Sequence, residues 1–313
     1  MRRTASGRRG WAGGIGISAT FAMLAIAASS AFAGTGGAPT PTSSPPPPGS
    51  GSGAPAAEPS AGAITLVAAE TKPRKSFYFG VRYPRLSYTL GSSQPQNDVR
   101  VDVVNGTGEI VRSFYRDDLA PNVAYNLRWD GTTIEGKPAR NGKYSFRISP
   151  QTPAPAARKA TATTTLGLGF TLYGYTFPVL GAHDYGGAMA RFGAGRSGHT
   201  HQGQDVMAAC GTPLVAARGG RVQFSGWDDG GGNYVVIDGK GTPNDFVYMH
   251  MAEPSPLKAG ETVRTGQPIG ITGTTGSSSG CHLHFEIWSA SGWYEGGSPF
   301  DPLAELQKWD RYS

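Results

Sequence analysis

Two histidines separated by one residue, in the segment 280–286 (Gly-Cys-His-Leu-His-Phe-Glu), constrain most strongly how this 313-residue chain can fold. The surrounding residues are strand formers. In a strand, residues i and i+2 point to the same face, with Cα atoms about 6.6 Å apart. The sequence therefore predicts a strand that presents His282 and His284 to one place. Such a pair suits a metal ligand beside a catalytic group.

A histidine and an aspartate stand four residues apart further upstream, at His201 and Asp205. In an extended strand their Cα atoms would be about 13 Å apart, too far to share an ion whose ligand bonds are about 2.0–2.2 Å long. A helix would bring them together, but the glycines at 198 and 203 disfavour a helix. We therefore predict a bend in the backbone between the two residues, which Gly203 is placed to allow.

A third motif, Tyr248-Met249-His250, ends an apolar run that begins near Phe246. Taken together, the His-x-x-x-Asp motif, the lone histidine after an aromatic residue and the final His-x-His motif resemble the lysostaphin and LytM-type zinc metallopeptidases. That family cuts peptide bonds in bacterial peptidoglycan. The resemblance runs from about residue 177 to 302, and no ligand or catalytic position is replaced. It therefore implies an active enzyme.

The resemblance assigns roles to five side chains. It implies that His201, Asp205 and His284 bind one zinc ion and that His250 and His282 are the catalytic histidines. Zinc with three protein ligands keeps a position for water, lowers the pKa of that water toward about 7 and can polarise a carbonyl oxygen. The two histidines would then transfer protons or stabilise the oxyanion. Which histidine does which stays open.

Two further histidines lie outside this pattern. His199 could compete as a ligand because it is two residues from His201, but the spacing to Asp205 favours His201. His183 is expected in a loop that could line the groove.

The resemblance favours a secreted zinc endopeptidase that acts on stem peptides or cross-bridges of peptidoglycan. Two alternatives remain: a non-catalytic wall-binding or amidase-activating scaffold, and a zinc protease that acts on extracellular protein. Loss of a ligand or a catalytic histidine is the usual mark of the scaffold class, and none is lost here. The sequence leaves open which bond is cut and how many copies assemble.

The only two cysteines, Cys210 and Cys281, each stand beside one of the zinc motifs. Because the resemblance brings both motifs to one ion, it also brings these neighbours together, and an exported chain is free to oxidise them. We therefore expect a disulfide, worth about 4 kcal/mol in the chain-entropy account for a loop of this length. The alternative, in which the cysteines are further zinc ligands, would fill the open position and abolish hydrolysis.

The first 33 residues are typical of a secretory signal peptide. Four arginines precede an uncharged stretch that starts at Gly10 and ends in Ala31-Phe32-Ala33, a small-residue cleavage site. We expect export to the cell wall, the periplasm or the medium, without stable membrane insertion once the signal is cleaved. An uncleaved membrane anchor is the alternative, because the stretch is long enough to span a bilayer.

Removal of residues 1–33 also changes the charge of the chain. It leaves 24 basic and 22 acidic residues, a formal charge of +2 in place of +6. The high isoelectric point of the whole chain therefore says little about partners. Basic clusters with interleaved aromatic residues do not occur, and a nucleic-acid partner has no support.

Residues 34–70 read as a disordered linker rich in proline, glycine and serine. In residues 71–165, alternating apolar residues at 99–103 and 144–148, separated by Asn-Gly and Asp-Gly turns, predict several short strands. The motif at Trp129-Asp130-Gly131, followed by residues 142–146, resembles the immunoglobulin-like domain of flagellar hook-assembly proteins. This implies a β-sandwich with a spacer, positioning or wall-binding role.

Residues 170–313 are expected to form the metallopeptidase domain, so the whole chain is mainly β. The resemblance implies an antiparallel sheet with zinc in a groove on its face. Strands are predicted at 221–224, 234–237, 246–250 and 282–288. The glycine-rich segments 230–232 and 273–280 lack the order of a phosphate loop and are expected to form flexible groove walls. Residues 293–313 are expected to pack over the sheet edge.

Overall fold

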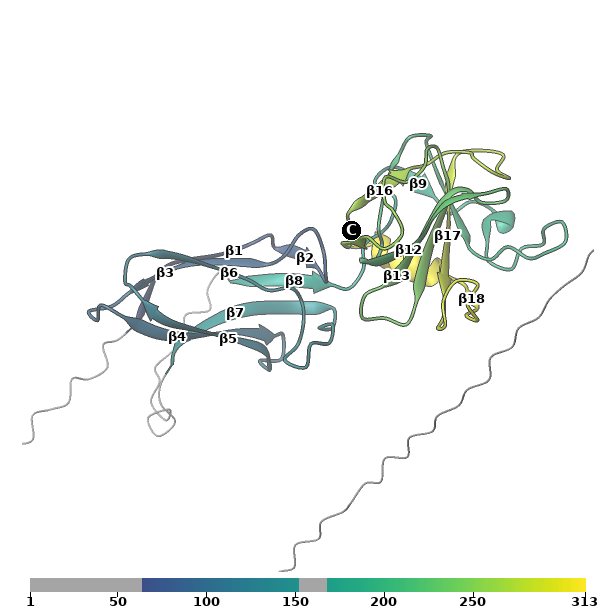
Figure 1. Ribbon diagram of the computed structural model, residues 1–313. Helices are drawn as coiled ribbons and strands as arrows, with labels where there is room; N and C mark the ends of the chain where they lie inside the picture. Colours follow the sequence, from purple (N-terminus) through teal and green to yellow (C-terminus); the bar gives the residue numbers. More distant parts are fainter. Residues whose placement is uncertain (1–63, 152–167) are drawn as a thin grey trace, which may run out of the picture. The chain divides into compact units, whose positions relative to one another are not determined.

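A computed structural model describes residues 64–151 and 168–313. The described chain is mainly β, with several antiparallel sheets and one α-helix near the C-terminus (Figure 1). The expected signal peptide, most of the expected linker and residues 152–165 at the end of the expected sandwich lie outside the described residues. Among the residues that are described, no helix has the length and apolar character needed to cross a membrane.

The N-terminal region contains two sheets. The first has three antiparallel strands in the order β1-β3-β6, and the second has five strands in the order β2-β8-β7-β4-β5. In the second sheet β2 pairs with β8 in parallel, and the other pairs are antiparallel. The strands are β1 (Thr65–Lys72), β2 (Lys75–Phe77), β3 (Arg85–Gly91), β4 (Asn97–Asn105), β5 (Ile110–Leu119), β6 (Ala124–Arg128), β7 (Gly142–Pro150) and β8 (Gly169–Tyr173).

Both N-terminal sheets contribute side chains to one hydrophobic core. The alternating valines 99, 101 and 103 of β4 are fully buried in it, as the period-two pattern predicted. Trp129, which follows β6, is also fully buried, and its indole N–H donates to the Thr132 carbonyl at 2.8 Å. The sequence motif around Trp129 therefore serves to close this core.

Two segment boundaries differ from the expected ones. Strand β1 begins at Thr65, six residues before the expected start of the β-sandwich at residue 71, because this segment pairs with β3 along its whole length. Strand β8, expected near the start of the metallopeptidase domain, pairs with β7 and β2. Its Phe170 and Leu172 are buried in the N-terminal core, so the chain through residue 173 belongs to the N-terminal sheets.

The C-terminal region is built on one antiparallel sheet in the order β15-β12-β13-β14-β17-β10-β9, with β18 also paired to β17. A separate two-stranded sheet pairs β11 with β16. The strands are β9 (His183–Asp184), β10 (Gln204–Ala208), β11 (Pro213–Val215), β12 (Gly220–Asp228), β13 (Gly232–Gly239), β14 (Asp245–Met251), β15 (Thr262–Val263), β16 (Pro268–Ile271), β17 (His282–Trp288) and β18 (Pro299–Phe300), with a short 3-10 helix η2 (Ala188–Ala190). The four predicted strands are β12, β13, β14 and β17.

Strand β17 is buried along its whole length, between β14 and β10. Leu283, Phe285 and Ile287 enter the main C-terminal core. The alternate residues, including His282 and His284, consequently project from the opposite face. The predicted strand thus presents both imidazoles to one side of the sheet.

The C-terminal segment continues from β18 into helix α1 (Leu303–Asp310). Leu306 and Trp309 of this helix are buried in the same core as Phe285 and Ile287. Residues 293–313 were expected to pack over the sheet edge. Instead, α1 packs into the core, and β18 pairs with the interior strand β17.

Candidate metal centre

The register of three neighbouring strands brings the predicted ligands together. Asp205 of β10 lies directly opposite His284 of β17, and Met249 of β14 lies opposite His284 on the other side. His201 precedes β10, and its backbone N–H donates to the Ala194 carbonyl at 2.8 Å. Sheet pairing therefore positions two ligands, and a loop hydrogen bond positions the third.

Gly203 allows the chain to approach β17 closely between His201 and Asp205. A Cβ at this position would clash with the Phe285 carbonyl and would lie 2.9 Å from Nε2 of His284. Contacts this short do not occur for real side chains. The sequence predicted that a bend occurs at this residue, and the structure adds that steric exclusion beside a ligand is the reason for glycine.

Three donor atoms form a nearly equilateral triangle. Nε2 of His201, Nδ1 of His284 and Oδ1 of Asp205 are each 2.9 Å from the other two. The three side chains are buried and form a group that could hold a metal ion. Tetrahedral ligands with bonds of about 2.0–2.1 Å stand about 3.3 Å apart, so the triangle needs to open by only a few tenths of an ångström to fit zinc.

Hydrogen bonds set which ring nitrogen of each clustered histidine faces the centre. Nδ1 of His201 lies 2.8 Å from the Arg191 carbonyl, which can only accept, so the ring carries its proton there and turns Nε2 inward. Nε2 of His284 lies 2.9 Å from Oε1 of Glu286, which leaves Nδ1 facing the centre. The other carboxylate oxygen of Glu286 accepts from the Trp288 indole at 2.6 Å. Such outer partners fix ligand orientation and raise ligand basicity.

The carboxylate and the imidazole of the cluster are electrostatically coupled. Burial alone would lower the pKa of His284, but hydrogen bonds to Asp205 and Glu286 raise this pKa to about 9. Burial would raise the pKa of Asp205, whereas hydrogen bonds from His201 and His284 hold it well below its usual range. The cluster therefore favours a positive charge at its centre.

His250 and His282 lie beside the triangle, with ring centroids 4.7 Å apart. Nδ1 of His250 lies 2.7 Å from the Thr275 carbonyl, and Nδ1 of His282 lies 2.8 Å from the Gly280 carbonyl. Each neutral ring thus carries its proton on Nδ1 and leaves Nε2 able to accept one. Nε2 of His282 is 3.5 Å from Oδ1 of Asp205, so it faces the centre.

His250 has an unusual backbone conformation. Its φ is +61°, in the left-handed region that non-glycine residues seldom adopt. Its N–H donates to the Gly231 carbonyl at 2.7 Å, which holds this conformation at the end of the β14–β17 pairing. Burial lowers the pKa of His250 to about 4, against a smaller opposing effect of its hydrogen bond to Thr275.

These five side chains line one groove with a volume of about 780 Å³. The glycine-rich segments form part of its walls, as predicted, and hydrogen bonds join them. Oδ1 of Asp228 accepts from the N–H groups of Gly230 and Gly231, and the N–H of Ser277 donates to the Gly230 carbonyl. Tyr294 lies at the exposed rim and donates its hydroxyl to Gln202 at 3.0 Å.

The other two histidines have separate places. His199 lines the groove, but it is exposed and is not part of the metal cluster. His183 does not line this groove, contrary to what we expected. It lies in β9, stacks near Phe177 and contacts Oδ2 of Asp310 at 3.1 Å, because β9 pairs with the far side of β10.

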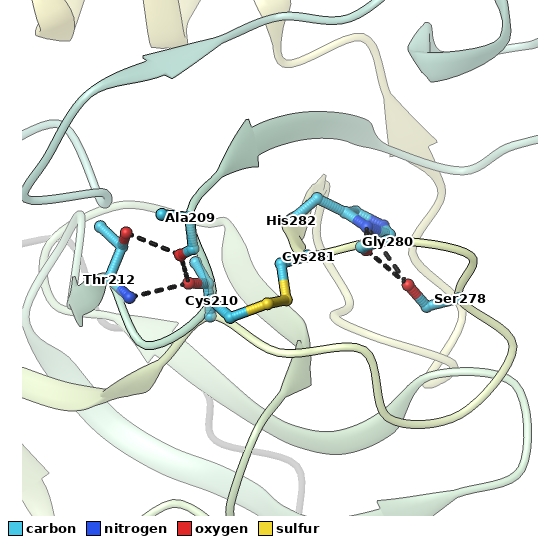
Figure 2. The surroundings of a disulfide bond; sticks show 8 residues. Ala209, Cys210, Thr212, Ser278, Gly280, Cys281 and His282 are labelled. Carbon is cyan, nitrogen blue, oxygen red and sulfur yellow. Dashed lines mark hydrogen bonds between the residues drawn. A yellow bond between two sulfur atoms is a disulfide. The ribbon is translucent and has the colours of Figure 1, made fainter.

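A disulfide joins Cys210 to Cys281, with Cα atoms 5.1 Å apart and a sequence separation of 71 (Figure 2). Figure 2 shows that it ties the loop after β10 to the residue that precedes His282. This confirms the expected pairing. The cysteines are therefore not metal ligands.

Comparisons with known proteins agree with this geometry. Residues 199–302 match the sequence profile of Peptidase family M23. The C-terminal part of the chain is a member of peptidase family M23. The match includes all five candidate site residues.

Among similar M23 proteins, the glycyl-glycine endopeptidase of Staphylococcus capitis is 34% identical over 36% of this chain and 31% of its own length. The L-Ala–D-Glu endopeptidase of Bacillus subtilis is 32% identical over 36% of this chain and 36% of its own length. The crystallised catalytic domain of lysostaphin from Staphylococcus simulans is 31% identical over 40% of this chain and 92% of that domain, with a TM-score of 0.35. The chain thus spans about a third of the length of these two endopeptidases.

Sequence reasoning missed three contributors to the M23 site. Glu286 could have been found, because it is two residues from His284 and therefore shares its face of β17. The Trp288 indole continues the same face. Arg196, whose Nη2 lies 3.5 Å from Oδ2 of Asp205, comes from a loop with no recognisable motif.

Proposed function

We propose that this protein is a secreted zinc metalloendopeptidase that hydrolyses peptide bonds in the stem peptides or cross-bridges of bacterial peptidoglycan. His201, Asp205 and His284 are the zinc ligands, and His250 and His282 are the catalytic residues. The observation that carries the proposal is the triangle of two imidazole nitrogens and one carboxylate oxygen beside two further imidazoles in one groove. This donor set is one that catalytic zinc sites use.

The residues around the centre are suited to hydrolysis. When bound, zinc supplies Lewis acidity that activates water and polarises a carbonyl group. His250 stays neutral at neutral pH because burial lowers its pKa, so its Nε2 can accept a proton. His282, held by the Gly280 carbonyl, presents its Nε2 to the same place and can exchange a proton there.

The names of the relatives support the substrate class. The two endopeptidases are named for a glycyl-glycine bond and for an L-Ala–D-Glu bond. The proposal therefore specifies peptide bonds of the cell wall as the substrate class. Which of these bonds is cut depends on the residues that line the groove. A bond between neutral glycines and a bond next to an acidic residue differ in charge, which an experiment can separate.

The same proposal covers the rest of the chain. Residues 1–33 direct export, and the N-terminal sheets form an immunoglobulin-like β-sandwich that acts as a spacer or positions the catalytic region. The shared core of the two sheets supports the sandwich. The disulfide supports export, because such bonds persist in oxidising compartments.

The test is incubation of the mature protein with purified sacculi, followed by mass analysis of the released muropeptides. We expect release that stops with chelator and returns when zinc is added. His284→Ala should bind substoichiometric zinc and release nothing. Zinc-loaded protein that releases no fragment from sacculi of any cross-bridge chemistry, yet binds them, would instead indicate a wall-binding scaffold. Cleavage of unrelated extracellular protein at a comparable rate would indicate a general protease.

A further inference from the structure

Arg196 is a cation held at the edge of the metal centre by backbone contacts. It belongs to a hairpin in which residues 195 and 200 form a β-bridge and the Arg196 N–H donates to the His199 carbonyl at 2.9 Å. The next residue after this hairpin is the ligand His201. Nη2 of Arg196 donates to the Met189 carbonyl at 2.7 Å and lies 3.5 Å from Oδ2 of Asp205. The side chain is 26% exposed and lines the groove.

Much of the guanidinium of Arg196 remains available for a ligand. Its Nη1 contacts only the Gly195 carbonyl, at 3.5 Å, and no described residue accepts a hydrogen bond from its Nε. A guanidinium has five N–H donors in a planar fork that matches a carboxylate. The fork therefore has unused donors in the groove, at the edge of the metal cluster.

The charge around the groove leaves Arg196 incompletely neutralised. It is the only arginine or lysine among the described residues that line the groove. Of the acidic residues there, Glu286 is buried and already bonded to His284 and Trp288, and Asp228 accepts two backbone N–H groups. Asp205 points its Oδ1 at His201 and His284, so only Oδ2 faces Arg196.

We infer that Arg196 binds a free carboxylate on the substrate residue next to the scissile bond. This inference rests on the proposed peptidase function and narrows its substrate class. A peptide with an acidic residue beside the cut bond is preferred over a neutral glycine bridge. The short distance between Arg196 and Asp205 places the bound carboxylate about one residue from a carbonyl at the metal centre.

A purely positioning role for Arg196 makes a different prediction. If the side chain served only to orient Asp205, its loss would weaken zinc binding and slow the cleavage of every substrate equally. If it binds a substrate carboxylate, its loss would remove the discrimination between acidic and neutral peptides. The ratio between two matched peptides therefore separates the two roles.

The experiment uses the full mature chain and two stem-peptide fragments that differ only in a free carboxylate or a carboxamide next to the scissile bond. We expect wild type to cleave the acid with a kcat/KM about 10- to 100-fold above that of the amide. Arg196→Gln should bring this ratio close to one at unchanged zinc content. Arg196→Lys, which keeps the charge without the fork, should retain an intermediate ratio.

A second experiment tests the preference for the acid without turnover. Calorimetry measures the affinity of zinc-loaded wild type and Arg196→Gln for uncleavable analogues of both peptides. Equal affinity of wild type for acid and amide would overturn the role of Arg196. So would an Arg196→Gln variant that loses zinc and slows on both peptides alike. A wild type that prefers the acid in binding but cleaves neither peptide nor sacculi would overturn the proposed function and leave carboxylate recognition supported.

Discussion

At the scale of single residues, His250 and His282 differ from the clustered ligands in their position beside the triangle and not within it. Both give Nδ1–H to a backbone carbonyl and neither belongs to the 2.9 Å triangle. We therefore predict that substitution of either residue leaves zinc bound and lowers turnover by about 10²- to 10⁴-fold, the usual contribution of a positioned acid or base.

The substitutions need to respect the backbone. His250→Asn suits the φ of +61°, because asparagine tolerates this region better than most residues, and His282→Ala suits an ordinary strand. The measurement is muropeptide release at equal zinc occupancy, with the unfolding midpoint as a control for folding. Wild-type rates in both variants would remove these histidines from the mechanism.

Glu286 offers a second prediction at this scale. Because Glu286 accepts from His284 on one oxygen and from Trp288 on the other, Glu286→Gln places an amide N–H against one of these donors. We expect zinc affinity to fall about 10- to 100-fold, the usual cost of losing an outer partner of a ligand. The measurement is competition with a chromophoric chelator.

Trp288→Phe is the matched control for Glu286→Gln. It removes one donor to Glu286 but leaves the bond to His284, so it should weaken zinc binding less. Equal affinities in wild type and Glu286→Gln would mean that sheet pairing alone holds the His284 ring.

Some of these residues could be predicted from the sequence, and others could not. The two-residue period of a strand predicts that His282 and His284 share one face. One more step of the same period places Glu286 on that face. The left-handed backbone of His250 depends on its bond to Gly231, which is 19 positions away in sequence. Arg196 reaches the centre only because its hairpin closes on itself, and its sequence carries no sign of this closure.

At the scale of elements, apolar runs predicted the strands of the C-terminal sheet, while pairing determined their boundaries. The runs at 221–224 and 234–237 extend to β12 and β13 because each strand continues as far as its partner does. The assignment of β8 failed for the same reason. Phe170 and Leu172 show an alternation that fits either core, and only their pairing with β7 decides between them.

The link between β10 and β17 supports a prediction about the disulfide. Cys210 follows β10 and Cys281 precedes β17, so the bond closes a long loop whose two ends already meet through the sheet. We expect the double variant Cys210→Ser, Cys281→Ser to lose about 4 kcal/mol of unfolding free energy. Urea unfolding of oxidised wild type and of the variant would measure this loss.

Thiol labelling checks the bond directly. Denatured but unreduced protein recovered from outside the cell should show no free cysteine. Two labelled thiols per chain would exclude the bond in the exported form.

At the scale of the whole molecule, burial of His250 makes stability depend on pH. In zinc-free protein its pKa is about 4, against about 6.5 in the unfolded chain. Between these values only the unfolded chain takes up the proton, so stability falls as pH falls from 6.5 toward 4. The loss approaches about 3 kcal/mol at the acid end.

His250→Asn should remove this part of the pH dependence. The measurement is the urea midpoint of chelated wild type and variant at pH 4.5 and pH 7. The raised pKa of His284 affects stability in a different pH range. The stabilising contribution of protonated His284 is complete below pH 6.5 and is lost as the pH rises toward 9. Parallel pH dependence in the two proteins below pH 6.5 would contradict the burial of a neutral His250.

The fluorescence of Trp288 should depend on whether the metal centre is occupied. Its N–H donates to Glu286, which is bonded to His284, so a change of charge at the cluster alters the electric field across a buried fluorophore. Addition of zinc to chelated protein should therefore shift the tryptophan emission of wild type, and Trp288→Phe should lose most of that shift. A side chain that helps to orient a ligand would then also report occupancy in real time, without an added dye.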